Sequence, residues 1–125
     1  MLTVEKIGGS SMIEFGEVLS NIIGRPDDDK FSYNRVFVVS AYAGVTDLLL
    51  ENKKNSEPGI YKSFVNDDEA YKEKLDELVL KLTDINKKFK GLGLDVKEAD
   101  RFIKKRIEHT KNYLDSMEEI LSSGY

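Results

Sequence analysis

Residues 2–11 read LTVEKIGGSS and residues 36–47 read VFVVSAYAGVTD, and these two stretches decide the fold class. Each begins with an apolar, β-branched run typical of a strand and continues into small and polar residues. Between them, the spacing predicts a helix over residues 12–23, with Ser10 or Ser11 as its N-cap. Its apolar face would contain Phe15, Val18, Leu19, Ile22 and Ile23.

The order of these elements predicts the sheet. Gly24–Asp29 would end the first helix in a polar loop, and a second helix would begin near Thr46 and Asp47. The continuous apolar run Val36–Val39 is typical of a strand that is buried on both faces. Strand, helix, strand and helix predict adjacent parallel strands with a right-handed crossover, in a three-layer α/β segment.

Residues 66–122 have a different, highly charged and helical pattern. Asn66 with Glu69, and Asp95 with Glu98, resemble capping boxes. Two apolar stripes follow these caps at helical spacing, one of Tyr71, Leu75, Leu78, Leu82, Ile85 and Phe89, and one of Val96, Ala99, Ile103, Ile107, Thr110, Leu114, Met117 and Leu121. Because Gly91–Gly93 permits a reversal, we expect an antiparallel helical hairpin. The joint between the two parts, residues 1–59 and 60–125, is predicted at Ser56–Gly59.

Length, composition and charge exclude several classes of protein. The chain has 125 residues, enough for one domain, and its net charge of −4 disfavours a nucleic-acid binder. It contains no cysteine, which removes disulfides, thiolate zinc sites and cysteine nucleophiles. No apolar run approaches the roughly 20 residues of a membrane span, and the N-terminus lacks the pattern of a secretory signal. We therefore expect a cytoplasmic protein without a membrane partner.

The first candidate site is the segment Lys6–Ser11 at the end of the first strand. Glycines allow the backbone to approach a phosphate closely, and a lysine offers positive charge to a phosphoryl group in transfer. The segment is neither a Walker A loop nor G-x-G-x-x-G, so spacing alone leaves a second reading open, a tight turn with a solvated lysine.

The second candidate is the segment Ser40–Asp47 at the carboxyl end of the second strand. Ligands of open parallel sheets bind beyond the carboxyl ends of the strands. The hydroxyls of Ser40 and Thr46 could hold a small polar substrate there, although Thr46 could equally be only a helix cap.

Together the two segments resemble the aspartokinases of the amino-acid kinase family. The matches are Lys6, Gly8, Gly9, Ser10 and Ser11 in the first motif, and Val38, Val39, Ser40, Ala41, Gly44, Thr46, Asp47, Leu49 and Leu50 in the second. The residues of both motifs are most similar to those of the aspartokinase variant associated with ectoine biosynthesis. The resemblance covers roughly the first 60 residues and implies an N-terminal portion of an amino-acid kinase domain, followed by a helical insertion.

The resemblance implies ATP-dependent phosphorylation of the β-carboxylate of L-aspartate, a step of amino-acid biosynthesis. Lys6 would be the catalytic cation, and together with Gly8–Ser11 it would bind the ATP phosphates. Ser40, Ala41 and Thr46 would bind aspartate, Mg²⁺ would accompany the nucleotide, and the full-length enzyme would be a homo-oligomer.

The remaining family motifs have no match here: the downstream Gly-Glu motif, the arginine that contacts aspartate, the nucleoside-binding region and the regulatory domains. We therefore expect this chain to be inactive alone. Two alternatives stay open, another amino-acid kinase (for glutamate, acetylglutamate or a nucleotide) and a non-catalytic helical interaction module.

Other conspicuous residues are interpreted as structural. His109 lies off the apolar stripe and is expected to be an exposed helix residue. Asp27–Asp29 lacks the spacing of a calcium loop, and Lys104–Arg106 is interpreted as a solvated helix face. Tyr61 and Phe64 are expected to be packing residues.

Overall fold

The computed structural model describes residues 2–23 and 34–124. The chain divides into two compact units, Met1–Thr46 and Asp47–Tyr125, which are described separately. The joint predicted at Ser56–Gly59 lies within the second unit, so the structure divides the chain earlier than the sequence analysis did. The predicted loop Gly24–Asp29, including Asp27–Asp29, lies outside the described residues.

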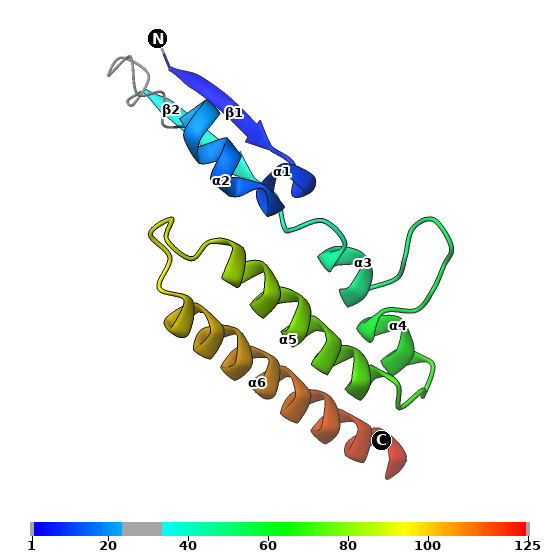
Figure 1. Cartoon of the computed structure of the whole chain (residues 1–125). Coiled ribbons are helices and arrows are strands. Elements are labelled where there is room, and N and C mark those ends of the chain that lie inside the picture. The colour runs from blue at the N-terminus through cyan, green and yellow to red at the C-terminus, as the bar shows by residue number, and fades with distance from the viewer. Residues whose placement is uncertain (1, 24–33, 125) are drawn as a thin grey trace. The chain divides into compact units, whose positions relative to one another are not determined.

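The first unit contains two parallel, hydrogen-bonded strands, β1 (Thr3–Ile7) and β2 (Arg35–Val39) (Figure 1). In the register, Lys6 is opposite Val38 and Ile7 is opposite Val39. The prediction that the two strands are parallel and adjacent is confirmed. The carboxyl ends of both strands therefore lie at the same edge of the sheet.

The helix predicted over residues 12–23 is shorter and interrupted. The structure has α1 (Gly9–Ile13), α2 (Phe15–Val18) and a π-helical turn, Leu19–Ile23. Gly8 is the N-cap of α1, so the prediction of Ser10 or Ser11 as the cap is wrong. Glu14 leaves the helical conformation between α1 and α2, with φ −94° and ψ 37°. The nearby Gly16 has a low helix propensity, which weakens continuation at this point.

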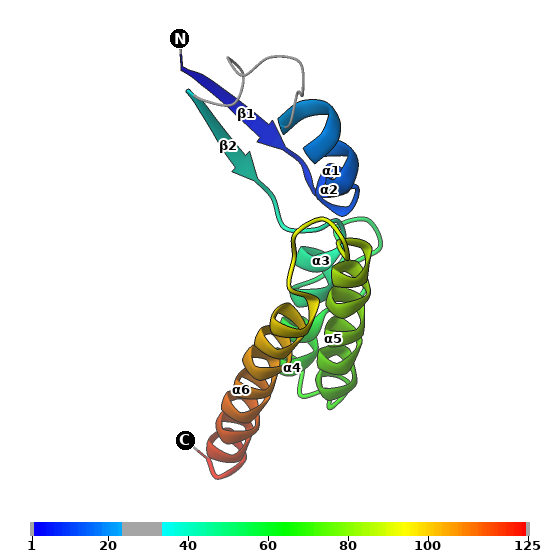
Figure 2. The same cartoon turned by 60° about the vertical axis from the view of Figure 1, so that its left-hand side comes forward.

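The two faces of the sheet differ. Helices α1 and α2 lie on one side of the strands (Figure 2), where Ile7 is buried together with Val18 of α2. Val4, Val36 and Val38 alternate onto the other face and are exposed. The prediction that Val36–Val39 is buried on both faces is therefore wrong for the described residues. Val36 and Val38 lie on the face without helices, and Val39, which is paired with Ile7 on the helix side, is exposed as well.

The second unit is built from helices. Helix α3 (Val45–Leu49) contains the division between the units, and it is followed by α4 (Ile60–Val65), α5 (Tyr71–Lys88) and α6 (Val96–Ser122). Asp95 caps α6 as predicted, since its side chain accepts from the Glu98 amide at 3.1 Å. Asn66 instead ends α4, so the predicted capping role of Asn66 with Glu69 is wrong. Among the residues described, no helix is long and apolar enough to cross a membrane.

Helices α5 and α6 pack as the predicted antiparallel hairpin (Figure 1). At one end the Tyr71 hydroxyl donates toward Asp115 (3.0 Å) and Glu118 (2.5 Å), and at the other the Asn86 amide donates to Asp100 (2.9 Å). Gly91 and Gly93 have φ of +84° and +100°, which glycine adopts without strain, and they make the reversal. The core of this unit contains Ile60, Tyr71, Leu75, Leu78, Ile85 and Phe89.

The first side chains of α5 are anchored firmly. The Phe64 and Tyr71 rings meet edge to face at 5.3 Å, which confirms the packing role predicted for Phe64. Tyr61 is exposed, so the same prediction is wrong for it. Burial raises the pKa of the Tyr71 phenol, and the hydrogen bonds to Glu118 and Asp115 raise that pKa further. The phenol therefore stays protonated at physiological pH and remains a donor to α6.

Candidate functional site

The first candidate loop connects β1 to α1. Gly8 is extended, and the first bond of α1 runs from the Met12 amide to the Gly8 carbonyl at 2.9 Å. The amides of Gly9, Ser10 and Ser11 precede this bond and have no place in the helical ladder. Since α1 has only five residues, its dipole is small, and the lysine before the loop must supply most of the positive charge.

The second candidate loop lies directly against the first. The Ser40 amide donates to the Ile7 carbonyl at 3.1 Å, and the Ala43 amide donates to the Gly9 carbonyl at 3.2 Å. A Cβ atom on Gly9 would lie 3.0 Å from the Ala41 carbonyl oxygen and 3.1 Å from the Ala43 nitrogen. The predicted neighbourhood of Gly8–Gly9 and Ser40–Ala41 is confirmed, and glycine at position 9 allows the close approach.

Lys6 and Ser40 belong to the open face of the sheet. Lys6 is paired in register with Val38, and both side chains are exposed. Ser40 comes two residues after Val38, and its amide extends the ladder, so alternation directs its side chain to the same face as Lys6. The ammonium group of Lys6 and the hydroxyl of Ser40 therefore lie on the same face of the sheet, near its carboxyl edge.

The hydroxyls of the first loop have a different environment. Ser10 and Ser11 are exposed and line a shallow hollow of about 360 Å³ together with Glu14, Glu17 and Asn21. Two carboxylates disfavour an anion in this hollow. A phosphate at this loop would therefore be bound by the backbone amides and Lys6. The serine side chains would contribute less to phosphate binding than the sequence suggested.

The rest of the second loop is arranged by Gly44 and Tyr42. Gly44 has φ of +83° and turns the chain into α3, which begins at Val45. Thr46 lies in the first turn of α3 with an exposed side chain, rather than ahead of the helix as a cap. Tyr42 is half-buried, and burial raises the pKa of its phenol. Ala41 is exposed beside Gly9 and offers its backbone to a ligand.

Sequence reasoning missed an ion pair that ties the two strands together. Arg35 binds the Glu5 carboxylate with two hydrogen bonds, from Nε at 2.5 Å and from Nη2 at 2.6 Å, and its guanidinium lies 4.8 Å from the Phe37 ring centroid. The hydrogen bond to Glu5 raises the pKa of the guanidinium. Charged residues at strand positions were the available signal. Their pairing needed the register, which places Arg35 opposite Thr3, two positions from Glu5 and on the same face of the sheet.

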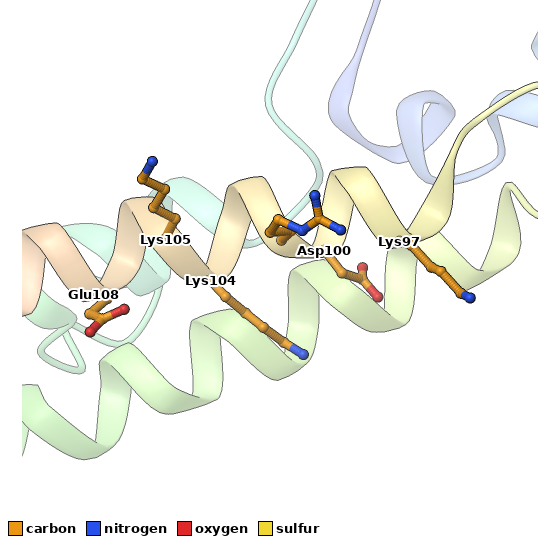
Figure 3. Close-up of a pocket in the computed structure, with 6 residues that line it drawn as sticks. Lys97, Asp100, Lys104, Lys105 and Glu108 are labelled. Carbon is orange, nitrogen blue, oxygen red and sulfur yellow. The ribbon is translucent and has the colours of Figure 1, made fainter.

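The hollow along α6 carries no comparable arrangement. It measures about 460 Å³, and every lining residue comes from this one helix: Lys97, Asp100, Arg101, Lys104, Lys105 and Glu108 (Figure 3). Arg101 pairs with Glu98, and Asp100 accepts from Asn86. Lys104–Arg106 and His109 are exposed, as predicted. Within residues 2–23 and 34–124, no group of three or more His, Cys, Asp or Glu residues could hold a metal ion.

Comparison with known proteins gives one informative match. The chain is 40% identical over 128 residues to the aspartate kinase Ask_Ect of Stutzerimonas stutzeri (strain A1501), an alignment that covers 100% of this chain. The resemblance to the aspartokinases is confirmed. The suffix in the relative's name agrees with the predicted ectoine-associated variant. No family model matches the chain, and no solved structure matches it.

The match covers 27% of the relative, so the chain spans about a quarter of the length of this aspartate kinase. The similarity is not limited to the two loops, because it extends over the helical unit as well. The loops that carry the aspartokinase-like motifs are also the two that the structure brings together.

Gly9→Ala tests the contact between the two loops. The new methyl group would press on backbone atoms of Ala41 and Ala43, which cannot rotate away. We expect a loss of about 1–3 kcal/mol of stability in the first unit, measured by native-state hydrogen exchange at the Ser40 and Ala43 amides. Gly8→Ala is the matched control, because a Cβ there meets no atom within 4 Å. Similar protection in the two variants would contradict the close contact.

Proposed function

We propose that this chain supplies the phosphate loop and part of the aspartate pocket of an aspartate kinase, an enzyme that transfers the γ-phosphoryl group of ATP to the β-carboxylate of L-aspartate. The observation that carries the proposal is the juxtaposition of the two loops at the carboxyl ends of adjacent parallel strands. This edge is the usual ligand position of open α/β sheets. The similarity to an aspartate kinase favours this reaction over other phosphoryl transfers.

In this proposal Lys6 is the catalytic residue of the chain. Its ammonium group neutralises charge on the γ-phosphoryl group as the bond to the β-phosphate breaks and the bond to the aspartate carboxylate forms. The backbone of Gly8–Ser11 holds the ATP phosphates, with glycines leaving room for their approach. The exposed positions of Lys6, Gly8, Ser10 and Ser11 support both roles.

The acceptor is held from the second loop. The hydroxyls of Ser40 and Thr46 and the backbone of Ala41 bind L-aspartate and direct its β-carboxylate toward the phosphates. Mg²⁺, when bound with the nucleotide, would neutralise part of the phosphate charge. Correct placement of donor and acceptor is the main contribution of such a site, because phosphoryl transfer requires little covalent chemistry from the protein.

The chain by itself supplies only part of this alignment. We propose that residues outside it hold adenine and clamp the α-amino and α-carboxylate groups of aspartate. We expect the 125-residue chain to show no aspartate-dependent ADP release with ATP and Mg²⁺. A chimera in which the chain replaces the matching segment of the Stutzerimonas aspartate kinase should release ADP when L-aspartate is added.

A coupled ADP-release assay measures both proteins under the same conditions. L-glutamate and N-acetylglutamate serve as competing acceptors, since other amino-acid kinases are the nearest alternative. A folded chimera that is inactive with aspartate would refute the function. Aspartate-dependent turnover by the chain alone, abolished by Lys6→Ala, would show that the chain contains a complete site.

A further inference from the structure

The longest helix of the protein, α6, has an apolar face that the hairpin does not cover. Phe102, Tyr113, Met117 and Ile120 are exposed, with Phe102 at 60% and Tyr113 at 71%. At 100° per residue these four side chains fall within one third of the helix circumference. Ile103, Ile107 and Leu114, which are partly buried, lie on a neighbouring face. We call the four exposed residues the outer stripe.

Charge is distributed unevenly along the same hairpin. The half next to the Gly91–Gly93 reversal, residues 81–106, contains nine Lys or Arg and four Asp or Glu. The other half, residues 71–80 and 107–122, contains three Lys or Arg and seven Asp or Glu. We call these the turn half and the open half. The hairpin is therefore positive at one end and negative at the other.

We propose that the outer stripe is a self-association surface on which a second copy of this chain docks with its α6 antiparallel to the first. In this arrangement the positive turn half of each copy faces the negative open half of the other, whereas parallel docking would bring like charges together. An antiparallel two-fold pair also makes the stripe complementary to itself, because Phe102 of one copy then faces Ile120 of the other.

The side chains beside the outer stripe are compatible with this orientation. In Figure 3, Lys105 points to the opposite side of α6 from Lys104 and Lys97, so the cations of the turn half surround the helix. The guanidinium of Arg106 lies 5.1 Å from the Phe102 ring centroid, at the positive end of the stripe. Antiparallel docking brings this end close to Glu119 of the second copy, at the negative end.

The size of the outer stripe predicts a reversible pair. From Phe102 to Ile120 a helix advances about 27 Å, and one helix face of that length buries less than the roughly 800 Å² per partner of a standard interface. Dimerisation should therefore be concentration-dependent. Salt should weaken it, since exposed charge pairs are screened at high ionic strength.

Sedimentation velocity of the 125-residue chain over a concentration series tests the surface. We expect a monomer–dimer equilibrium that weakens at least tenfold in Tyr113→Ser/Ile120→Ser. Leu80→Ser should leave the equilibrium unchanged, because Leu80 is equally exposed but lies on α5, outside the stripe. Circular dichroism verifies that each variant is folded. A chain that is monomeric at every concentration, or equal weakening by the α5 control, would overturn the proposal.

Thiol cross-linking tests the orientation, because the chain contains no native cysteine. Lys105→Cys and Ser116→Cys place single thiols on the same flank of α6, on either side of the expected two-fold axis near residue 111. A short bis-maleimide should join the two variants to each other more efficiently than either variant to itself. Preferential cross-linking of like with like would refute antiparallel docking, since it indicates parallel helices.

Discussion

Replacement of Lys6 by alanine in the chimeric aspartate kinase should lower kcat by about 100- to 1,000-fold, the usual effect of removing one group that stabilises transition-state charge. The KM for ATP should change much less. The ammonium group matters most while the phosphoryl group is in transit, and a contact made mainly in the transition state appears in kcat. Steady-state kinetics with ATP and L-aspartate varied in turn separate the two effects.

Two further variants test whether the effect is specific to Lys6. One keeps a positive charge at position 6, and the other removes a lysine elsewhere in the chain. Lys6→Arg should restore little activity, because a planar guanidinium is larger and presents its donors in a fixed fork. Lys53→Ala removes an exposed lysine from the segment between α3 and α4 and should leave kcat unchanged. An unaltered kcat in Lys6→Ala, or a loss confined to KM, would contradict the catalytic role.

The part of the fold that follows from local pattern was predictable. The strand runs, the order of elements and the reversal at Gly91–Gly93 were sufficient to predict parallel neighbours in the first unit and an antiparallel hairpin in the second. The boundaries of the helices were harder to predict from the sequence. The start of α1 at Gly9 was missed because serine is a stronger N-cap than glycine by residue type, whereas the structure caps this helix with Gly8.

The candidate site was predictable to a similar extent. Both loops could be found from their glycines, hydroxyls and lysine, and their adjacency followed from the strand order. The Arg35 pair with Glu5 was missed because two charged strand residues become partners only once the register is known. The carboxylates of Glu14 and Glu17 beside Ser10 were missed for a related reason, since the break at Glu14 determines which side chains surround the hollow.

The second helix of the hairpin shows the limit of periodicity. Apolar spacing predicted one stripe through Thr110, Met117 and Leu121, but these side chains are exposed. The face turned toward α5 includes polar residues, because Tyr71 and Asn86 hydrogen-bond to Asp115, Glu118 and Asp100. Apolar spacing alone does not reveal these polar contacts, and the outer stripe lies outside the face that makes them.

Leu75→Ala should be the most destabilising simple truncation in the hairpin. Leu75 is 1% exposed, on the side of α5 that also buries Tyr71 and Leu78. Deleting three buried carbons from such a position removes apolar contact and leaves a cavity, and we expect a loss of about 3 kcal/mol in the free energy of unfolding. Urea denaturation followed by far-ultraviolet circular dichroism measures the loss, since α5 and α6 contribute most of the helical signal.

Leu80→Ala is the matched control, because it makes the same chemical change on the same helix at a side chain that is 64% exposed. Its effect should stay within about 0.5 kcal/mol, as for other surface substitutions. An unchanged m-value in both variants would show that the difference lies in the folded hairpin rather than in the unfolded chain. Equal losses would mean that position 75 is not enclosed, and the packing of α5 against its neighbours would then be wrong.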